Sequence, residues 1–173
     1  MSAEPIPNRP ALSFTHETPR DQPAVEALLD RAFGPGRFVK VSERVREIAD
    51  FAPELSFLAW SEGQLRGVVR QWRVRVGGAS VVFLGPLAVD PDQWSAGVGR
   101  ELVARACAAA KAAGEAAIVL VGDSGYFNRF GFSADLAREI QLPGPVDKRR
   151  VLVRAFGPQG EQLRGGAAPL TAG

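Results

Sequence analysis

The stretch from Val81 to Arg100 constrains the fold of this chain more than any other. It begins as an apolar, β-branched run, passes through Gly85-Pro86 and ends in a glycine-containing loop before a helix expected near Val98. This order of strand, loop and helix N-terminus favours an anion site, because the first N–H groups of a helix lack internal partners and carry partial positive charge. Gly97-Val98-Gly99 alone is also typical of an ordinary turn, so the rest of the chain has to decide between these interpretations.

Apolar spacing along the rest of the chain predicts alternating strands and helices. The expected strands are residues 11–16, 55–60, 65–76, 79–89, 115–121 and 151–156, and the expected helices are 18–33, 41–51, 98–112 and a short one within 122–132. The right-handed crossover rule places the strand at 115–121 beside the strand at 79–89 and parallel to it. We therefore predict a mixed α/β (α+β) fold, with a mostly antiparallel sheet of six to seven strands and about four flanking helices.

Length and composition predict a single globular domain. A chain of 173 residues with 46% apolar and 23% charged residues can bury one substantial core. We expect residues 1–10 to form a flexible leader, residues 11–157 the domain and residues 158–173 a loose C-terminal tail. No apolar run is long enough to span a bilayer and no secretion signal is evident, and the single Cys107 fits a reducing compartment. These features predict a cytoplasmic protein without a membrane partner.

The charged residues argue against two further classes of function. The net charge is only +2, and the basic residues form no stripe with interleaved aromatic residues, so no nucleic-acid partner is expected. No set of His, Cys, Asp and Glu has the spacing of metal ligands, so no metal site is expected.

Several motifs, taken together, resemble one family. Between about residues 13 and 156 the chain is similar to GNAT-type N-acetyltransferases, and more narrowly to their YhbS-like bacterial branch. The motifs that carry the resemblance are Ala32-Phe-Gly-Pro-Gly-Arg37, Leu84-Gly-Pro-Leu-Ala-Val-Asp-Pro91, Gly97-Val98-Gly99 followed by Leu102, Gly122-Asp123, Tyr126-Phe-Asn-Arg-Phe-Gly-Phe132 and Leu142-Pro-Gly-Pro145.

The resemblance implies acetyl-CoA as co-substrate and a strand at 79–89 that bulges and splays from its parallel neighbour. Gly85-Pro86 is a credible cause of the bulge, because proline donates nothing to a ladder and glycine favours bulges. The pantetheine arm would then pair with free backbone groups of Leu87 and Val89, as a peptide adds to a sheet edge. Carried over by position, the cofactor-binding residues are Leu87, Ala88, Val89, Trp94, Ser95, Ala96, Gly97, Val98, Gly99, Arg100, Phe127 and Arg129.

The resemblance also implies direct attack of a primary amine, from a small molecule or a peptide, on the thioester. A tyrosine of the family often protonates the departing thiolate, but Phe127 stands at its usual position here. The neighbouring Tyr126, the only tyrosine, is the candidate acid; the competing interpretation is an anchor for the crossover strand. In the loop, Trp94, Ser95 and Ala96 replace the family's usual Gln or Arg, Gly and basic residue, and Trp94 could pack on the adenine or simply cover the sheet.

Other hypotheses remain open on the sequence alone. Phe127 and Trp94 also suit a weakly catalytic or non-catalytic acyl-CoA sensor or docking module of the same fold. A dinucleotide-binding oxidoreductase is disfavoured, because Gly97-Val98-Gly99 lacks a third glycine and follows too long a loop. No general base is identifiable: His16 is expected to be a surface or capping residue at the end of a strand, and Glu43, Glu47 and Glu54 are expected to be solvated. A homodimer that shares the late strands is compatible with the sequence.

Overall fold

The computed structural model describes residues 11–34, 41–91, 97–144 and 146–170. Its strands are β1 (Ser13–Thr15), β2 (Asp50–Phe51), β3 (Phe57–Ser61), β4 (Gln64–Val76), β5 (Ala79–Val89), β6 (Ala117–Val121), β7 (Ile140–Gln141), β8 (Val151–Ala155) and β9 (Gly165–Ala168). Its α-helices are α1 (Gln22–Phe33), α2 (Val41–Ile48), α3 (Val98–Ala112), α4 (Ser124–Phe127) and α5 (Pro158–Glu161). Short 3₁₀ helices are η1 (Pro19–Asp21), η3 (Pro53–Leu55), η4 (Asn128–Phe130), η5 (Asp135–Ala137) and η6 (Lys148–Arg150).

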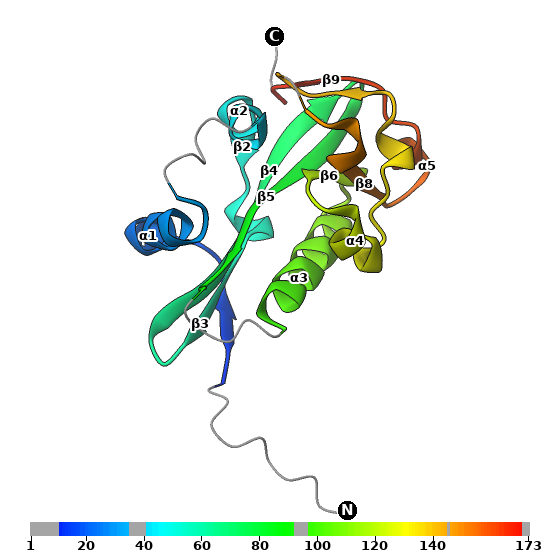
Figure 1. The fold of residues 1–173 in the computed structure, drawn as a ribbon. Helices are drawn as coiled ribbons and strands as arrows, with labels where there is room; N and C mark the ends of the chain where they lie inside the picture. The colour runs from blue at the N-terminus through cyan, green and yellow to red at the C-terminus, as the bar shows by residue number, and fades with distance from the viewer. Residues whose placement is uncertain (1–10, 35–40, 92–96, 145, 171–173) are drawn as a thin grey trace, which may run out of the picture.

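One sheet organises the molecule, in the strand order β1-β3-β4-β5-β6-β8. The pairs along this path are antiparallel except β5 and β6, which are parallel as the crossover rule predicts. The long hairpin of β4 and β5 runs through the molecule, with α1 and α2 on one side of it and α3 and α4 on the other (Figure 1). The predicted fold class is therefore confirmed.

Helix α3 packs closely on the sheet because its inward residues are small or flexible. Val98, Leu102, Ala106 and Ala110 are buried, as the apolar spacing predicts. On β4, Gly67 allows the approach: a Cβ atom added there would lie 2.8 Å from Cδ1 of Leu102. This contact fixes the first turns of α3 against β4 and the end of β5.

Two expectations about elements are wrong. Asp50 and Phe51 were expected to end the second helix, but they form β2 and pair with Arg73 and Trp72 on β4. The reason is packing, because the rings of Phe51 and Trp72 contact each other in a tilted arrangement, with centroids 5.0 Å apart.

The second difference concerns the loose C-terminal tail predicted for residues 158–173, of which the structure describes residues 158–170. They form α5 and β9 instead, and β9 pairs with Arg75 and Val76 of β4 and with β7. Leu163 lies between the two elements and is buried in the core. Across the described residues, no helix combines the length and apolar character needed to cross a membrane.

Candidate functional site

The parallel strands β5 and β6 separate after a short contact. They pair only at Val82 with Ile118 and at Phe83 with Val119. Beyond this point β5 continues for six residues to Val89, while β6 ends at Val121. One edge of β5 is therefore left without a neighbouring strand, which is the predicted splay.

A bulge in β5 lies where the splay begins. Leu84 pairs with Gln71 and Leu87 with Val69, so Gly85 and Pro86 together face the single residue Arg70 of β4. Gly85 has φ 145°, a backbone conformation that favours glycine, and the Gly85–Pro86 peptide bond is cis. The two residues named from the sequence therefore make the bulge.

The indole of Trp72 holds the bulge from β4. Its Nε1 donates a hydrogen bond to the carbonyl oxygen of Gly85 at 2.7 Å, which satisfies an acceptor that the bulge takes out of the ladder. The guanidinium of Arg46 on α2 is also close, since a Cβ atom at Gly85 would lie 3.2 Å from its Nη1. Sequence reasoning missed both contacts.

The backbone groups of Leu87 and Val89 point toward the open side of β5. Asp90 N donates to Arg66 O at 2.8 Å, so residues 66 and 90 form a hydrogen-bonded pair of the antiparallel ladder. In an antiparallel ladder, hydrogen-bonded and non-hydrogen-bonded residue pairs alternate. Ala88 and Val68 therefore form the next hydrogen-bonded pair, and the backbone N–H and C=O groups of Leu87 and Val89 face away from β4. The Ala88 side chain is buried against α1 residues.

The N-terminus of α3 lies beside this open edge. Gly97 is the N-cap and is left-handed, with φ 86°. The first helical bond runs from Glu101 N to Gly97 O, so the N–H groups of Val98, Gly99 and Arg100 have no acceptor within the helix. The side chain of Arg100 is exposed. The predicted residues Trp94, Ser95 and Ala96 lie outside the described residues.

Tyr126 reaches across from α4 to the same place. A Cβ atom added to Gly99 would lie 3.2 Å from the Tyr126 hydroxyl and 3.5 Å from Cγ2 of Val89. The hydroxyl, the first turn of α3 and the end of β5 therefore meet at one point. Glycine at position 99 leaves this point open.

Phe127 faces a different way from its neighbour. Its ring lies on the backbone of Gly122, where an added Cβ atom would be 2.6 Å from its Cε2. The ring is half-buried against the α3 core and meets Phe132 edge-on at 5.8 Å. The position at which the resemblance implies a tyrosine is thus occupied by an apolar ring packed on the end of β6.

Arg129 supports Tyr126 from the solvent side. Its Nε donates to the Tyr126 carbonyl oxygen at 3.1 Å, and its guanidinium carbon lies 5.1 Å from the centre of the Tyr126 ring. This cation–π contact orients the tyrosine ring.

Buried charges lie on the α1 side of β4, at Arg70, the residue that faces the bulge. Arg70 donates to Glu17 from Nε and from Nη2, the latter at 2.9 Å, and it also pairs with Glu26 on α1 at 3.4 Å. Arg70 and Glu17 are both buried, so each compensates the desolvation of the other. An arginine on the inner face of a central strand is the sequence signal that could have revealed this pair.

Two of the groups considered as general bases, His16 and Glu54, have partners outside the open edge of β5. His16 Nδ1 lies 3.0 Å from Ser56 O, which agrees with a capping role. The Arg73 guanidinium, through its hydrogen bond to Glu54, holds the pKa of that carboxyl below its usual range. Glu47 is exposed, and the side chain of Glu43 lies outside the described residues.

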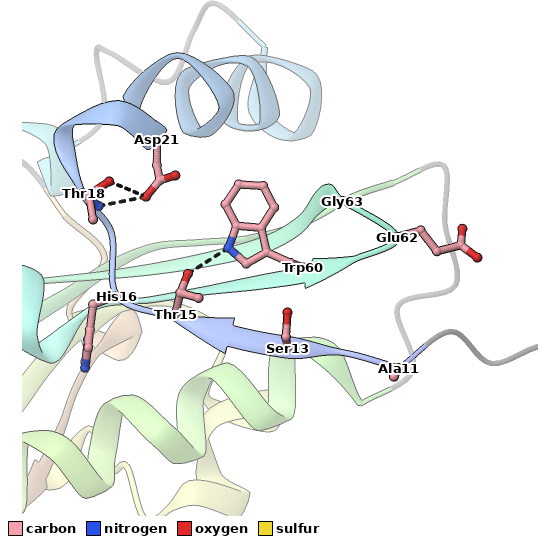
Figure 2. Close-up of a pocket in the computed structure, with 9 residues that line it drawn as sticks. All are labelled: Ala11, Ser13, Thr15, His16, Thr18, Asp21, Trp60, Glu62 and Gly63. Carbon is pink, nitrogen blue, oxygen red and sulfur yellow. Dashed lines mark hydrogen bonds between the residues drawn. The ribbon is translucent and has the colours of Figure 1, made fainter.

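A separate pocket of about 480 Å³ lies at the edge strand, where His16, Thr15 and Trp60 belong to its lining. Figure 2 shows Trp60 and His16 on opposite sides of the strands, with the Trp60 indole directed at Thr15. Nε1 of Trp60 donates to Thr15 Oγ1 at 2.8 Å. Because β4 separates this edge from β5, the pocket does not belong to the splay.

A mixed sheet that splays after a bulge, with a helix N-terminus beside the open strand, defines an acyl-CoA-type acetyltransferase fold. The chain belongs to the Acetyltransferase (GNAT) family, whose model matches residues 23–132.

Known proteins agree with this assignment. The chain is 33% identical over 132 residues to the uncharacterized N-acetyltransferase YhbS of Escherichia coli K12, covering 75% of this chain and 78% of that protein. The crystal structure of E. coli YhbS in complex with CoA has a TM-score of 0.76 at 25% identity and covers 96% of this chain and 92% of that one. A GNAT family acetyltransferase from Brucella melitensis in complex with acetyl-CoA has a TM-score of 0.68 at 27% identity and covers 94% and 98%.

Proposed function

We propose that this protein transfers the acetyl group of acetyl-CoA to a primary amine of a small molecule or peptide by direct attack. The observation that carries the proposal is the open edge of β5, where the backbone groups of Leu87 and Val89 face the gap to β6. The two similar structures that hold CoA and acetyl-CoA support the choice of co-substrate.

In this proposal the cofactor lies along β5 and ends at α3. The amides of the pantetheine arm pair with Leu87 and Val89, as an added strand would. The pyrophosphate accepts hydrogen bonds from the N–H groups of Val98, Gly99 and Arg100, where the helix dipole favours negative charge. Backbone donors of this kind also polarise the thioester carbonyl as the amine attacks it.

Tyr126 has two candidate roles beside this cofactor. Its hydroxyl is next to Gly99 and Val89, and Leu87 lies two residues earlier, about 6–7 Å along the strand. The Tyr126 hydroxyl either protonates the departing thiolate or holds the cofactor by a hydrogen bond. Tyr126→Phe separates the two: loss of the acid lowers kcat and flattens its pH profile, whereas loss of a cofactor contact raises KM for acetyl-CoA and leaves the shape of the profile unchanged.

The test of the enzymatic function is CoA release in the presence of a panel of primary amines. We expect at least one amine to raise release well above hydrolysis, with acetyl-CoA binding measured separately by calorimetry. If acetyl-CoA binds with micromolar affinity and no amine raises release, the protein is not an acetyltransferase for that panel.

The packing of Phe127 favours a second candidate function, that of an acyl-CoA-binding sensor or docking module. Its ring has no proton to give and is packed on Gly122. Comparing wild type with Phe127→Tyr tests this reading: a sensor leaves both at background release while both bind acetyl-CoA.

A further inference from the structure

A buried glutamine lies between the two elements that form the proposed cofactor site. Gln71 on β4 is fully buried, and it pairs with Leu84 of β5, the last residue before the bulge. Its side chain extends to α3, where Nε2 donates to the carbonyl oxygen of Ala106 at 3.0 Å. Gln71 therefore contacts both the strand that carries the open edge and the helix whose N-terminus lies beside that edge.

The same amide is also joined to η3. Its Nε2 donates to Leu55 O at 2.5 Å. Because both partners are carbonyl oxygens, which only accept, the nitrogen of the amide must face them. The other amide atom, Oε1, is buried and has no hydrogen-bond partner among the described residues. A buried acceptor without a partner lowers stability, so stability alone gives little reason for a glutamine here.

The backbone of Gln71 is held as firmly as its side chain. Its N–H donates to Ser56 Oγ at 2.9 Å, and that hydroxyl donates to Ala52 O at 2.7 Å. Ala52 N in turn donates to Gln71 O at 3.0 Å. The amide is therefore prepositioned, because residues 52–56 fix the part of β4 from which it extends.

The bond to Ala106 supplies a constraint that the apolar contacts of α3 lack. The inward face of α3 packs on the sheet through small apolar side chains, and such contacts have no preferred direction. A hydrogen bond requires a narrow range of distance and angle, so a shift of α3 by about 1 Å along its axis breaks the bond. Ala106 and Gly99 belong to the same helix, about 10 Å apart at 1.5 Å per residue. The Gln71 amide therefore fixes where the first turn of α3 lies relative to β5.

From these contacts we infer that Gln71 is a positioning residue for acetyl-CoA, which sets the spacing between the two parts of the cofactor site. The pantetheine part is the open edge at Leu87 and Val89, and the pyrophosphate part is the first turn of α3. Gln71 belongs to neither part and acts through α3 and β5. The inference rests on the cofactor arrangement of the proposed function, but it does not depend on acetyl transfer.

A comparison of the whole cofactor with its two halves tests the inference. A ligand that binds at two linked parts gains affinity over its halves only when the spacing of the parts matches its own length. The probes are acetyl-CoA, titrated by calorimetry, and S-acetylpantetheine and ADP, titrated by NMR. All titrations are run well below the lowest Tm of the variants, so that every protein is fully folded.

Three variants are compared with wild type. Gln71→Met keeps a side chain of similar length and removes the donor. Ser56→Ala keeps the amide but removes the hydroxyl that holds its strand, and it decides the test if Gln71→Met does not fold. Ser61→Ala is the matched control, because Ser61 is also a buried serine near β4 and its Oγ has no partner among the described residues.

We expect Gln71→Met to bind acetyl-CoA about tenfold more weakly than wild type, and Ser56→Ala about threefold more weakly, the scale of single hydrogen bonds. S-acetylpantetheine and ADP should bind both variants as they bind wild type, because each part stays intact and only the spacing changes. Ser61→Ala should bind all three probes as wild type does.

Two results overturn the inference. The first is that Gln71→Met, or Ser56→Ala where the former does not fold, binds acetyl-CoA with the affinity of wild type. The second is that the variants lose affinity for the halves in the same proportion as for acetyl-CoA, which indicates damage to the parts themselves. Failure of the proposed function is distinguishable, because it appears as an absence of amine-dependent CoA release by wild type and leaves these affinities unchanged.

Discussion

Gly99, in the first turn of α3, lies next to the open edge of β5. The Tyr126 hydroxyl and the Val89 side chain both lie close to where its Cβ atom would be. The backbone there also supplies a free N–H group of the first helical turn. At the scale of single residues, Gly99 therefore determines both the space at the proposed cofactor site and one of its backbone hydrogen-bond donors.

We predict that Gly99→Ala weakens acetyl-CoA binding about tenfold, because the added methyl group pushes on Tyr126 and narrows the path of the cofactor. Calorimetric titration with acetyl-CoA measures the effect. Gly78→Ala is the matched control, since a Cβ atom there meets nothing within 4 Å. Equal affinities of the two variants would contradict this account of position 99.

Cys107 should be chemically inert in the folded protein. The thiol is buried in α3, and burial raises its pKa although the nearby Arg154 acts in the opposite direction. The reactive thiolate is therefore scarce at neutral pH. We expect slow alkylation by iodoacetamide at pH 7.5 and fast alkylation in urea, followed by mass spectrometry. A folded-state rate equal to that in urea would show that the thiol is accessible.

At the scale of elements, the position of the open edge depends on how β4 holds the bulge of β5. We predict that Trp72→Phe lowers the stability by about 1–3 kcal/mol, the cost of leaving a buried acceptor unsatisfied. The same substitution is expected to weaken acetyl-CoA binding, because Leu87 follows the bulge directly. Urea unfolding and calorimetry measure the two effects.

Trp60→Phe is the matched control for this experiment. Its indole also donates one hydrogen bond, to Thr15 Oγ1, but it lies at the edge of the sheet. It should leave acetyl-CoA binding unchanged. If both tryptophan variants bind acetyl-CoA as wild type does, the bulge is not held by Trp72.

The elements that could be predicted are those with a strong period. The apolar stripe of α3 gave its bounds, and the crossover rule gave the parallel pairing of β5 with β6. The short strands β7 and β9 could not be predicted, because two to four residues carry no period and Gly165–Ala168 has no large side chains.

Within the candidate site, the family resemblance implied a bulge in β5, and the backbone preferences of Gly85 and Pro86 indicated where it lies. The sequence was not sufficient for the approach of Tyr126 to Gly99 or for the bond from Trp72 to Gly85. Those contacts depend on how far α4 and β4 lie from β5 after folding, and no local pattern reports such distances.

At the scale of the whole molecule, Arg73 connects three parts of the chain. It pairs with Glu54 in η3 and with Glu115 just before β6. Arg73 lowers the pKa of the Glu54 carboxyl in the folded state. The ionised carboxylate therefore contributes fully to the stability of the fold at pH values above its unfolded-state pKa, about 4.3. That contribution is lost as the pH falls through the folded-state pKa.

We therefore predict that the Tm of wild type falls more steeply than that of Glu54→Gln as the pH is lowered from 6 to 3. Calorimetric scans at closely spaced pH values measure both slopes. Glu62→Gln, which removes an exposed carboxyl from the β3–β4 turn, is the control and should follow wild type. Parallel curves for wild type and Glu54→Gln would exclude this linkage.

The pairing of β9 with β4 has a consequence for synthesis on the ribosome. Arg75 and Val76 receive this partner from residues 167 and 168, more than ninety positions later in the chain. The end of β4 therefore stays an open edge until nearly all of the described chain has been made. During that interval a nascent chain exposes a pairing surface that chaperones or neighbouring nascent chains can reach.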